Sequence, residues 1–92
     1  MIKSWRHKGL KLFYETGSVA KIQAKHADKI HTILQALDIA TDPKQMNFPG
    51  LNLHPLRGDL NEFFAVKISG NWRIIFAFEN RHAILVDYID YH

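Results

Sequence analysis

The stretch EFFAVKISGNWRIIFAFENRHAILVDYID, residues 62–90, decides the fold of this chain. Its first two strand-like runs, residues 62–68 and 72–78, alternate between apolar and other side chains, as half-buried strands do. A third run, residues 83–89, is apolar on both faces over most of its length, which predicts a well-covered strand. Short connections separate the runs, so the stretch predicts an antiparallel meander. The two hairpin connections are residues 69–71 and 80–82.

The residues before this stretch change to a helical period. Leu10, Phe13 and Tyr14 lie at i, i+3 and i+4, which predicts a short helix, and Gly17 is a natural stop for it. A second helix is predicted over residues 24–40, where apolar residues form one stripe and charged residues face outward. The stripe consists of Ala27, Ile30, Ile33, Leu34 and Leu37.

Two further segments complete the predicted architecture. Residues 2–5 are β-prone and form a strand if another strand pairs with them. Residues 42–61 hold all three prolines of the chain and read as a long irregular connection, beginning where Pro43 ends the second helix. Loops of this length in small domains are often functional. We therefore predict one α+β domain, residues 1–92, with an N-terminal strand, two helices and an antiparallel meander.

The composition is that of a small folded protein. The chain has 92 residues, of which 47% are apolar and 23% charged, enough for one hydrophobic core. It has no cysteine, so packing and not disulfides must stabilise it, which suits a reducing cytoplasm. The N-terminal residues contain no apolar stretch of signal-peptide length, and no apolar run reaches the roughly 20 residues that a membrane span needs. We expect a cytoplasmic protein.

The net charge of +3 is unevenly distributed. Residues 1–25 contain six lysines and arginines and one glutamate, a net charge of +5, so the other residues sum to −2. A basic end suits a polyanionic surface such as RNA, and Lys8 and Lys11 are candidates for substrate binding. Lysines on a solvated helix face are equally common, so the charge alone decides nothing.

Residues with acid–base chemistry gather in the second half of the chain. Asp90, Tyr91 and His92 follow an apolar strand directly, and alternation places Asp90 and His92 on one face with Tyr91 on the other. His54 lies in the connection before the sheet. Arg73 stands alone among Trp, Ile and Phe in a central strand, where a charged residue needs an anionic ligand or a carboxylate partner. That partner would be Asp87, Asp90 or the terminal carboxylate.

The six histidines do not have the spacing of a metal site. His26 and His31 are five residues apart on a predicted helix, so they do not share a face, and no carboxylate cluster suits magnesium. Glycine patterns for phosphate or dinucleotide binding are absent. We expect no metal or cofactor. RNA cleavage without metal uses the 2′-hydroxyl of the substrate as nucleophile and needs a base, an acid and cations. His54 and His92 supply the proton carriers in either order, with Arg57 and Arg73 as cations.

Several segments, in order along the whole chain, resemble the HigB toxins of the RelE/ParE superfamily. They are Met1-Ile2-Lys3-Ser4 with His7-Lys8-Gly9-Leu10, residues 53–59 (LHPLRGD), residues 71–74 (NWRI) and residues 87–92 (DYIDYH). The resemblance implies a RelE-like fold. It also implies a bacterial type II toxin that cleaves mRNA in the ribosomal A site and is silenced by a HigA antitoxin carrying a helix-turn-helix.

The resemblance also implies roles for single residues. Arg73 falls on the phosphate-contacting arginine of the family. Position 57 often carries lysine there, and Arg57 keeps the charge but does not release a proton at neutral pH. The family's catalytic positions fall on His54, Asp90, Tyr91 and His92.

Two alternatives remain open on the sequence. One is a ParE-like toxin that inhibits gyrase without catalysis, against which the imidazoles of His54 and His92 argue. The other is a non-catalytic RNA-binding or interaction module in which the basic N-terminal part carries the function. In that case replacing His92 is harmless and replacing Lys8, Lys11 and Lys21 is not.

Overall fold

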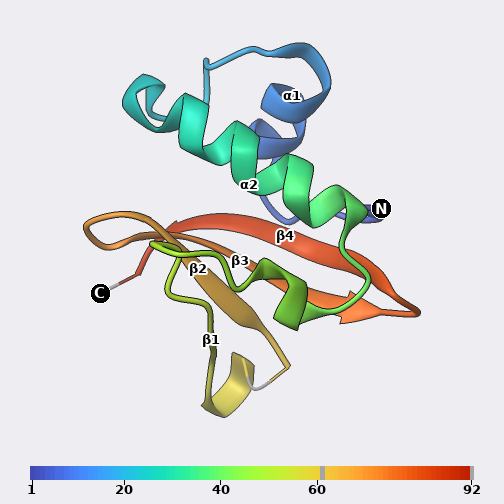
Figure 1. Cartoon of the computed structure of the whole chain (residues 1–92). Helices are drawn as coiled ribbons and strands as arrows, with labels where there is room; N and C mark the ends of the chain where they lie inside the picture. Colours follow the sequence, from blue (N-terminus) through green and yellow to red (C-terminus); the bar gives the residue numbers. More distant parts are fainter. Residues whose placement is uncertain (61, 92) are drawn as a thin grey trace.

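A computed structural model describes residues 1–60 and 62–91. Four strands form one antiparallel sheet in the order β1-β2-β3-β4, and both α-helices cover the same side of it (Figure 1). The predicted α+β class is confirmed. The elements are α1 (Lys8–Thr16), η1 (Ala24–His26), α2 (Ala27–Ile39), η2 (Pro43–Met46), β1 (His54–Pro55), η3 (Gly58–Leu60), β2 (Phe64–Ser69), β3 (Trp72–Glu79) and β4 (His82–Asp90).

The meander of β2, β3 and β4 is confirmed. Val66 pairs with Ile74, and Ile74 with Tyr88, so the apolar residues of the three strands meet on the face that the helices cover. The β3–β4 turn has positive φ at both central residues, Asn80 (51°) and Arg81 (67°), which is typical of a tight two-residue hairpin.

Both helices are confirmed close to their predicted bounds. Gly17 ends α1 with φ of 81°, a left-handed conformation that glycine adopts without steric cost. At the other end of α1, Nδ1 of His7 accepts a hydrogen bond from the backbone N–H of Leu10. The predicted stripe of α2 is the buried one. Its fully packed members are Ile30, Ile33, Leu34 and Leu37.

The predicted N-terminal strand is wrong in its regular form. Residues 2–5 run alongside β4 but form only two isolated parallel bridges, Ile2 with Ala83 and Trp5 with Val86. The cause is a bulge in β4: the pairing with β3 shifts between Ile75 and Ala77, and Leu85 has a φ of 54°. The backbone N–H of Leu85 donates a hydrogen bond to Oγ of Ser4 and not to a backbone carbonyl of a neighbouring strand.

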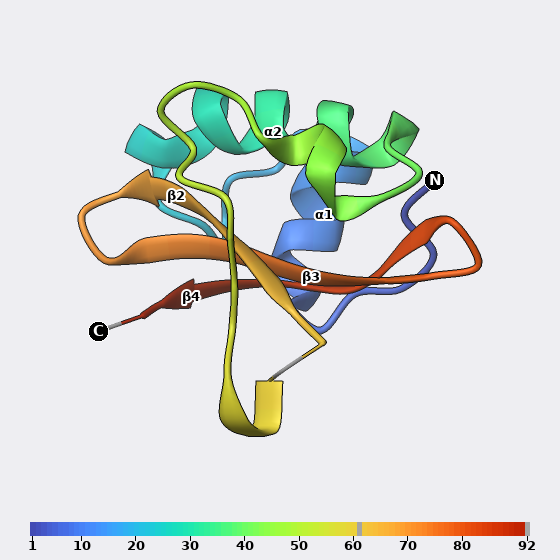
Figure 2. The ribbon, with the colours of Figure 1, turned by 60° about the horizontal axis from the view of Figure 1, so that its bottom comes forward.

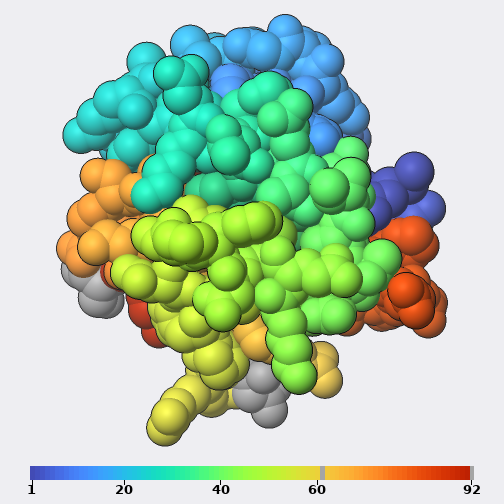
Figure 3. Space-filling view, in the orientation of Figure 1, coloured from blue at the N-terminus to red at the C-terminus, as the bar shows by residue number. Residues whose placement is uncertain are grey.

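The connection before β2 is more ordered than the sequence predicts. It contains η2, η3 and the two-residue strand β1, which pairs with β2 through His54–Ala65 and Pro55–Phe64. In the space-filling view this connection, green to yellow, forms much of the surface below the helices (Figure 3). A structural role as a sheet edge thus accompanies the expected functional one. Within the described residues, no helix is long and apolar enough to cross a membrane.

Candidate active site

The face of the sheet turned away from α1 and α2 carries most of the side chains with catalytic potential. Directly paired residues of antiparallel strands point to the same face, so the register defines rows across it. We call it the open face, and Figure 2 shows it crossed by the segment before β2. One row consists of Lys67, Arg73 and Ile89, and the next of His54, Ala65, Ile75 and Asp87.

The guanidinium of Arg73 is anchored by backbone and not by a carboxylate. Its Nη1 donates to the carbonyl oxygens of Gly70 (2.7 Å) and Trp72 (3.1 Å), while Nε is buried without a hydrogen-bond partner. In the described part of the chain no ion pair joins Arg73 to Asp87, so that predicted pair is wrong. The terminal carboxylate, another of the predicted partners, lies outside the described residues.

Lys67 is a residue of this site that the sequence did not reveal. It lies directly opposite Arg73 on β2, and both side chains are half-buried on the open face. Like charges placed opposite each other repel, so an anion bound between them would stabilise the pair. The signal was a lysine at the polar position of an alternating strand, which in a sequence is indistinguishable from a solvated lysine.

His54 is held by its own chain at the edge of the sheet. Its Nδ1 lies 2.8 Å from the carbonyl oxygen of Asn52, which has a φ of 51°. A carbonyl only accepts, so Nδ1 carries the proton in neutral His54 and Nε2 keeps its lone pair. Two strand spacings and two residues separate His54 from Arg73, about 12 Å between Cα atoms. Ala65 lies on β2 between them and is fully buried.

The end of β4 lies beside the hairpin that holds Arg73. The backbone N–H of Tyr91 donates to the carbonyl oxygen of Asn71 (2.8 Å), next to the Gly70 carbonyl that binds Arg73. The side chain of Tyr91 is 43% exposed. Asp90 pairs with Trp72 and so belongs to the helix-covered side, the opposite side from Arg73. The remaining predicted residue, His92, lies outside the described residues.

The side that Asp90 shares holds three packed aromatic rings. Trp72 stacks on Tyr88 with ring centres 4.6 Å apart, and the buried His26 places Nδ1 2.7 Å from the Tyr88 hydroxyl. Burial lowers the pKa of His26 and raises that of Tyr88, so both stay neutral. His26 is therefore a core histidine, and the cluster fixes the ends of β3 and β4.

The predicted substrate-binding residues do not all join the open face. Arg57 is exposed in the segment between β1 and η3. Lys8 and Lys11 line a groove of about 530 Å³ between the N-terminal segment and α1, together with Lys3 and Glu15. None of the open-face residues lines that groove, so the structure keeps these lysines apart from Arg73 and His54.

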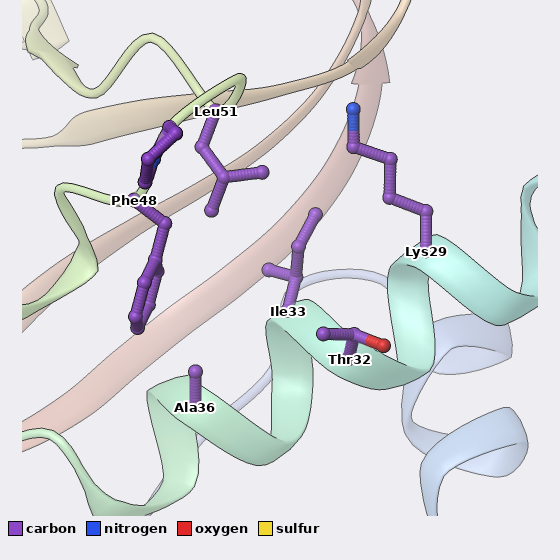
Figure 4. Close-up of a pocket in the computed structure, with 7 residues that line it drawn as sticks. Lys29, Thr32, Ile33, Ala36, Phe48 and Leu51 are labelled. Carbon is purple, nitrogen blue, oxygen red and sulfur yellow. The ribbon is translucent and has the colours of Figure 1, made fainter.

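An apolar pocket of about 340 Å³ lies between α2 and residues 48–51 (Figure 4). Ile33, Ala36, Phe48 and Leu51 line it, and Lys29 is its one titratable side chain. The ammonium of Lys29 donates to the carbonyl oxygen of Ile68. None of the residues that the sequence predicts for the site lines this pocket. Among the residues described, no group of three or more His, Asp or Glu side chains is placed to hold a metal ion.

The sequence is similar to that of known proteins over nearly its whole length. Residues 3–92 match a family described as the RelE-like toxin of the type II toxin-antitoxin system HigB. The Endoribonuclease HigB of Proteus vulgaris is 44% identical over 92 residues, which cover 100% of both chains. The similarity therefore includes every segment that forms the open face.

Proposed function

The chain belongs to the HigB-like family of RelE-like type II toxins, and on that basis we propose that it is an endoribonuclease whose reactive site is the open face. Membership of a type II toxin-antitoxin system implies an antitoxin partner. The observation that carries the proposal is the cationic pair of Lys67 and Arg73, which face each other on β2 and β3 one row from His54 and Asp87.

The reaction follows from the protonation state of His54. Its Nε2 takes the proton of the 2′-hydroxyl as the 2′-oxygen attacks phosphorus. Arg73 and Lys67 stabilise the negative charge that builds on the phosphorane oxygens, with Arg57 entering from the adjacent loop. The bond from phosphorus to the 5′-oxygen breaks, and that oxygen receives a proton. The products are a 2′,3′-cyclic phosphate and a 5′-hydroxyl.

The acid comes from the end of the chain. Tyr91 is held next to the hairpin that anchors Arg73, which supports a place for the terminal residues beside the leaving 5′-oxygen. His92 is the proton donor in this proposal, a role that rests on the sequence resemblance. Asp90 lies on the opposite side of β4, so in this proposal it helps to position the terminal residues and does not contact the phosphate. Lys8 and Lys11 contribute a salt-sensitive attraction to RNA at a distance from the cut.

The cellular setting is part of the proposal. A site with few substrate contacts gains most from a partner that presents the RNA in line for attack, and a ribosome with mRNA in its A site does so. A HigA-like antitoxin with a helix-turn-helix would be the partner that silences the toxin, and the cytoplasm is the compartment where all of these components meet.

Expression in bacteria tests the function. We expect induction of the wild-type chain to arrest growth within minutes and to create new 5′ ends inside the coding regions of transcripts. Cells expressing an Arg73→Met variant to the same level should show neither effect. Growth arrest without new transcript ends, together with loss of gyrase supercoiling activity, would instead identify the ParE-like alternative.

A further inference from the structure

The guanidinium of Arg6 lies over an aromatic ring at the apolar end of the open face. Cζ of Arg6 is 5.1 Å from the centre of the Phe63 ring, and the Phe63 side chain is only 8% exposed beneath it. Arg6 itself is exposed. A cation over an aromatic face is attracted by the electrons of the ring, which favours this position of the guanidinium. Phe63 occupies one side of the guanidinium, and the exposure of Arg6 leaves the side chain accessible from the solvent.

The bulge in β4 brings Arg6 to this position. Leu85 and Val86 together oppose Phe76, so both Ile84 and Leu85 pack on the open face. The N–H of Arg6 donates to the carbonyl oxygen of Val86 (2.9 Å) just beyond the bulge. Trp5 faces the main core, where its ring packs against Tyr14, and the alternation sends the next side chain to the open face.

The Arg6–Phe63 stack lies next to the proposed reaction centre. Phe63 precedes Ala65 by two residues, and Ala65 pairs with His54 and with Ile75 in the row that ends at Asp87. Two residues along a strand correspond to about 7 Å. The surroundings of Phe63 are apolar. They include Leu56 and Ala77 as buried members of the same cluster, with Leu60, Ile84 and Leu85 partly buried around it.

We propose that the Arg6 guanidinium is the stacking platform for the nucleobase on one side of the cleaved phosphodiester. Single-stranded RNA is held by stacking of bases on aromatic rings and arginine planes. A base on Arg6 would direct its adjoining phosphate along the open face toward the rows that hold His54 and Arg73. This inference rests on the proposed endoribonuclease activity. It adds Arg6 as a substrate-positioning residue, at a position to which the family resemblance assigned no catalytic role.

Programmed ribosomes carrying mRNA with one abasic nucleotide test the platform. We expect the abasic nucleotide on one side of the cut to slow single-turnover cleavage by the wild type on the order of 10-fold relative to intact mRNA. Arg6→Lys keeps the charge but has no plane, so it should cut intact and abasic mRNA at the same reduced rate. Arg81→Lys, at an exposed arginine of the distant β3–β4 turn, is the matched control and should keep the wild-type difference.

The possible outcomes distinguish a failure of the Arg6 platform from a failure of the endoribonuclease proposal. If the wild type cuts intact mRNA and an abasic nucleotide on either side has no effect, or if Arg6→Lys retains the full abasic penalty, Arg6 is not the platform. If the wild type cuts no mRNA at all, the endoribonuclease proposal fails first. Thermal melting of each variant shows whether loss of the contact with Phe63 has acted only through stability.

Discussion

Replacing Arg73 with methionine is expected to slow mRNA cleavage by about 100-fold or more while the fold is kept. The guanidinium donates to the carbonyl oxygens of Gly70 and Trp72, two backbone groups at the strand end that can bind water once the side chain is removed. Methionine fills similar space and leaves no buried Nε without a partner. The loss should appear in the single-turnover rate constant on programmed ribosomes, because the interaction is strongest in the transition state.

Two further variants serve as controls for the Arg73→Met variant. Arg73→Lys should recover part of the rate, since it restores the charge without the planar pair of donors. Arg81→Met removes an exposed arginine far from the hairpin at Gly70 and should cut at the wild-type rate. If Arg73→Met melts like the wild type and retains more than a third of its cleavage rate, the guanidinium does not stabilise the phosphorane.

Replacing His54 with alanine is expected to lower the cleavage rate by about 100- to 1,000-fold, the usual contribution of a general base. The bond from Nδ1 to the Asn52 carbonyl fixes which nitrogen is basic, so the loss should be in the chemical step and not in ribosome binding. Single-turnover cleavage and co-sedimentation with ribosomes, measured on the same preparations, separate the two effects.

The histidine on α2 provides the control for His54. His31 is exposed and far along the chain from the open face, so His31→Ala should cut at a rate close to that of the wild type. A His54→Ala variant that cuts as fast as His31→Ala would remove the imidazole from the proton transfer. The base would then have to be sought among the residues at the end of β4.

The elements that the sequence predicts correctly depend on local periodicity. The alternation in β2 and β3 and the stripe of Ile30, Ile33 and Leu34 in α2 encode which face is buried. Gly17 ends α1 because the required left-handed φ is a property of one residue. These features need no knowledge of distant contacts, and the structure confirms them.

The elements that the sequence missed depend on contacts between distant segments. β1 is a strand only because β2 pairs with it, and its composition, His54 and Pro55, is that of a loop. The bulge at Leu85 requires Ser4, 81 residues away, to satisfy a turned N–H. That bulge also prevents a regular N-terminal strand. No periodicity in the sequence reports either event.

The candidate site shows the same division. Arg73 stands out in the sequence because it is charged within an apolar strand. Lys67 and Arg6 do not, since their importance follows from the register of β2 against β3 and from the path of the first residues along β4. The acid–base chemistry of His54, Asp90 and Tyr91 also singles them out in the sequence, and the structure adds that Asp90 lies on the opposite side of the sheet from Arg73.

The chemistry of the cut ends tests the central claim most directly. Purified protein would be incubated with ribosome-bound mRNA that carries a single 2′-deoxy nucleotide 5′ to the cut, beside the same mRNA with ribose there. Attack by the 2′-hydroxyl predicts that the ribose substrate yields a 5′-hydroxyl and a 2′,3′-cyclic or 3′-phosphate end, and that the deoxy substrate is not cut at that site. Cleavage of both substrates at the same rate, with a 5′-phosphate on the product, would contradict the account, because an activated water would then be the nucleophile.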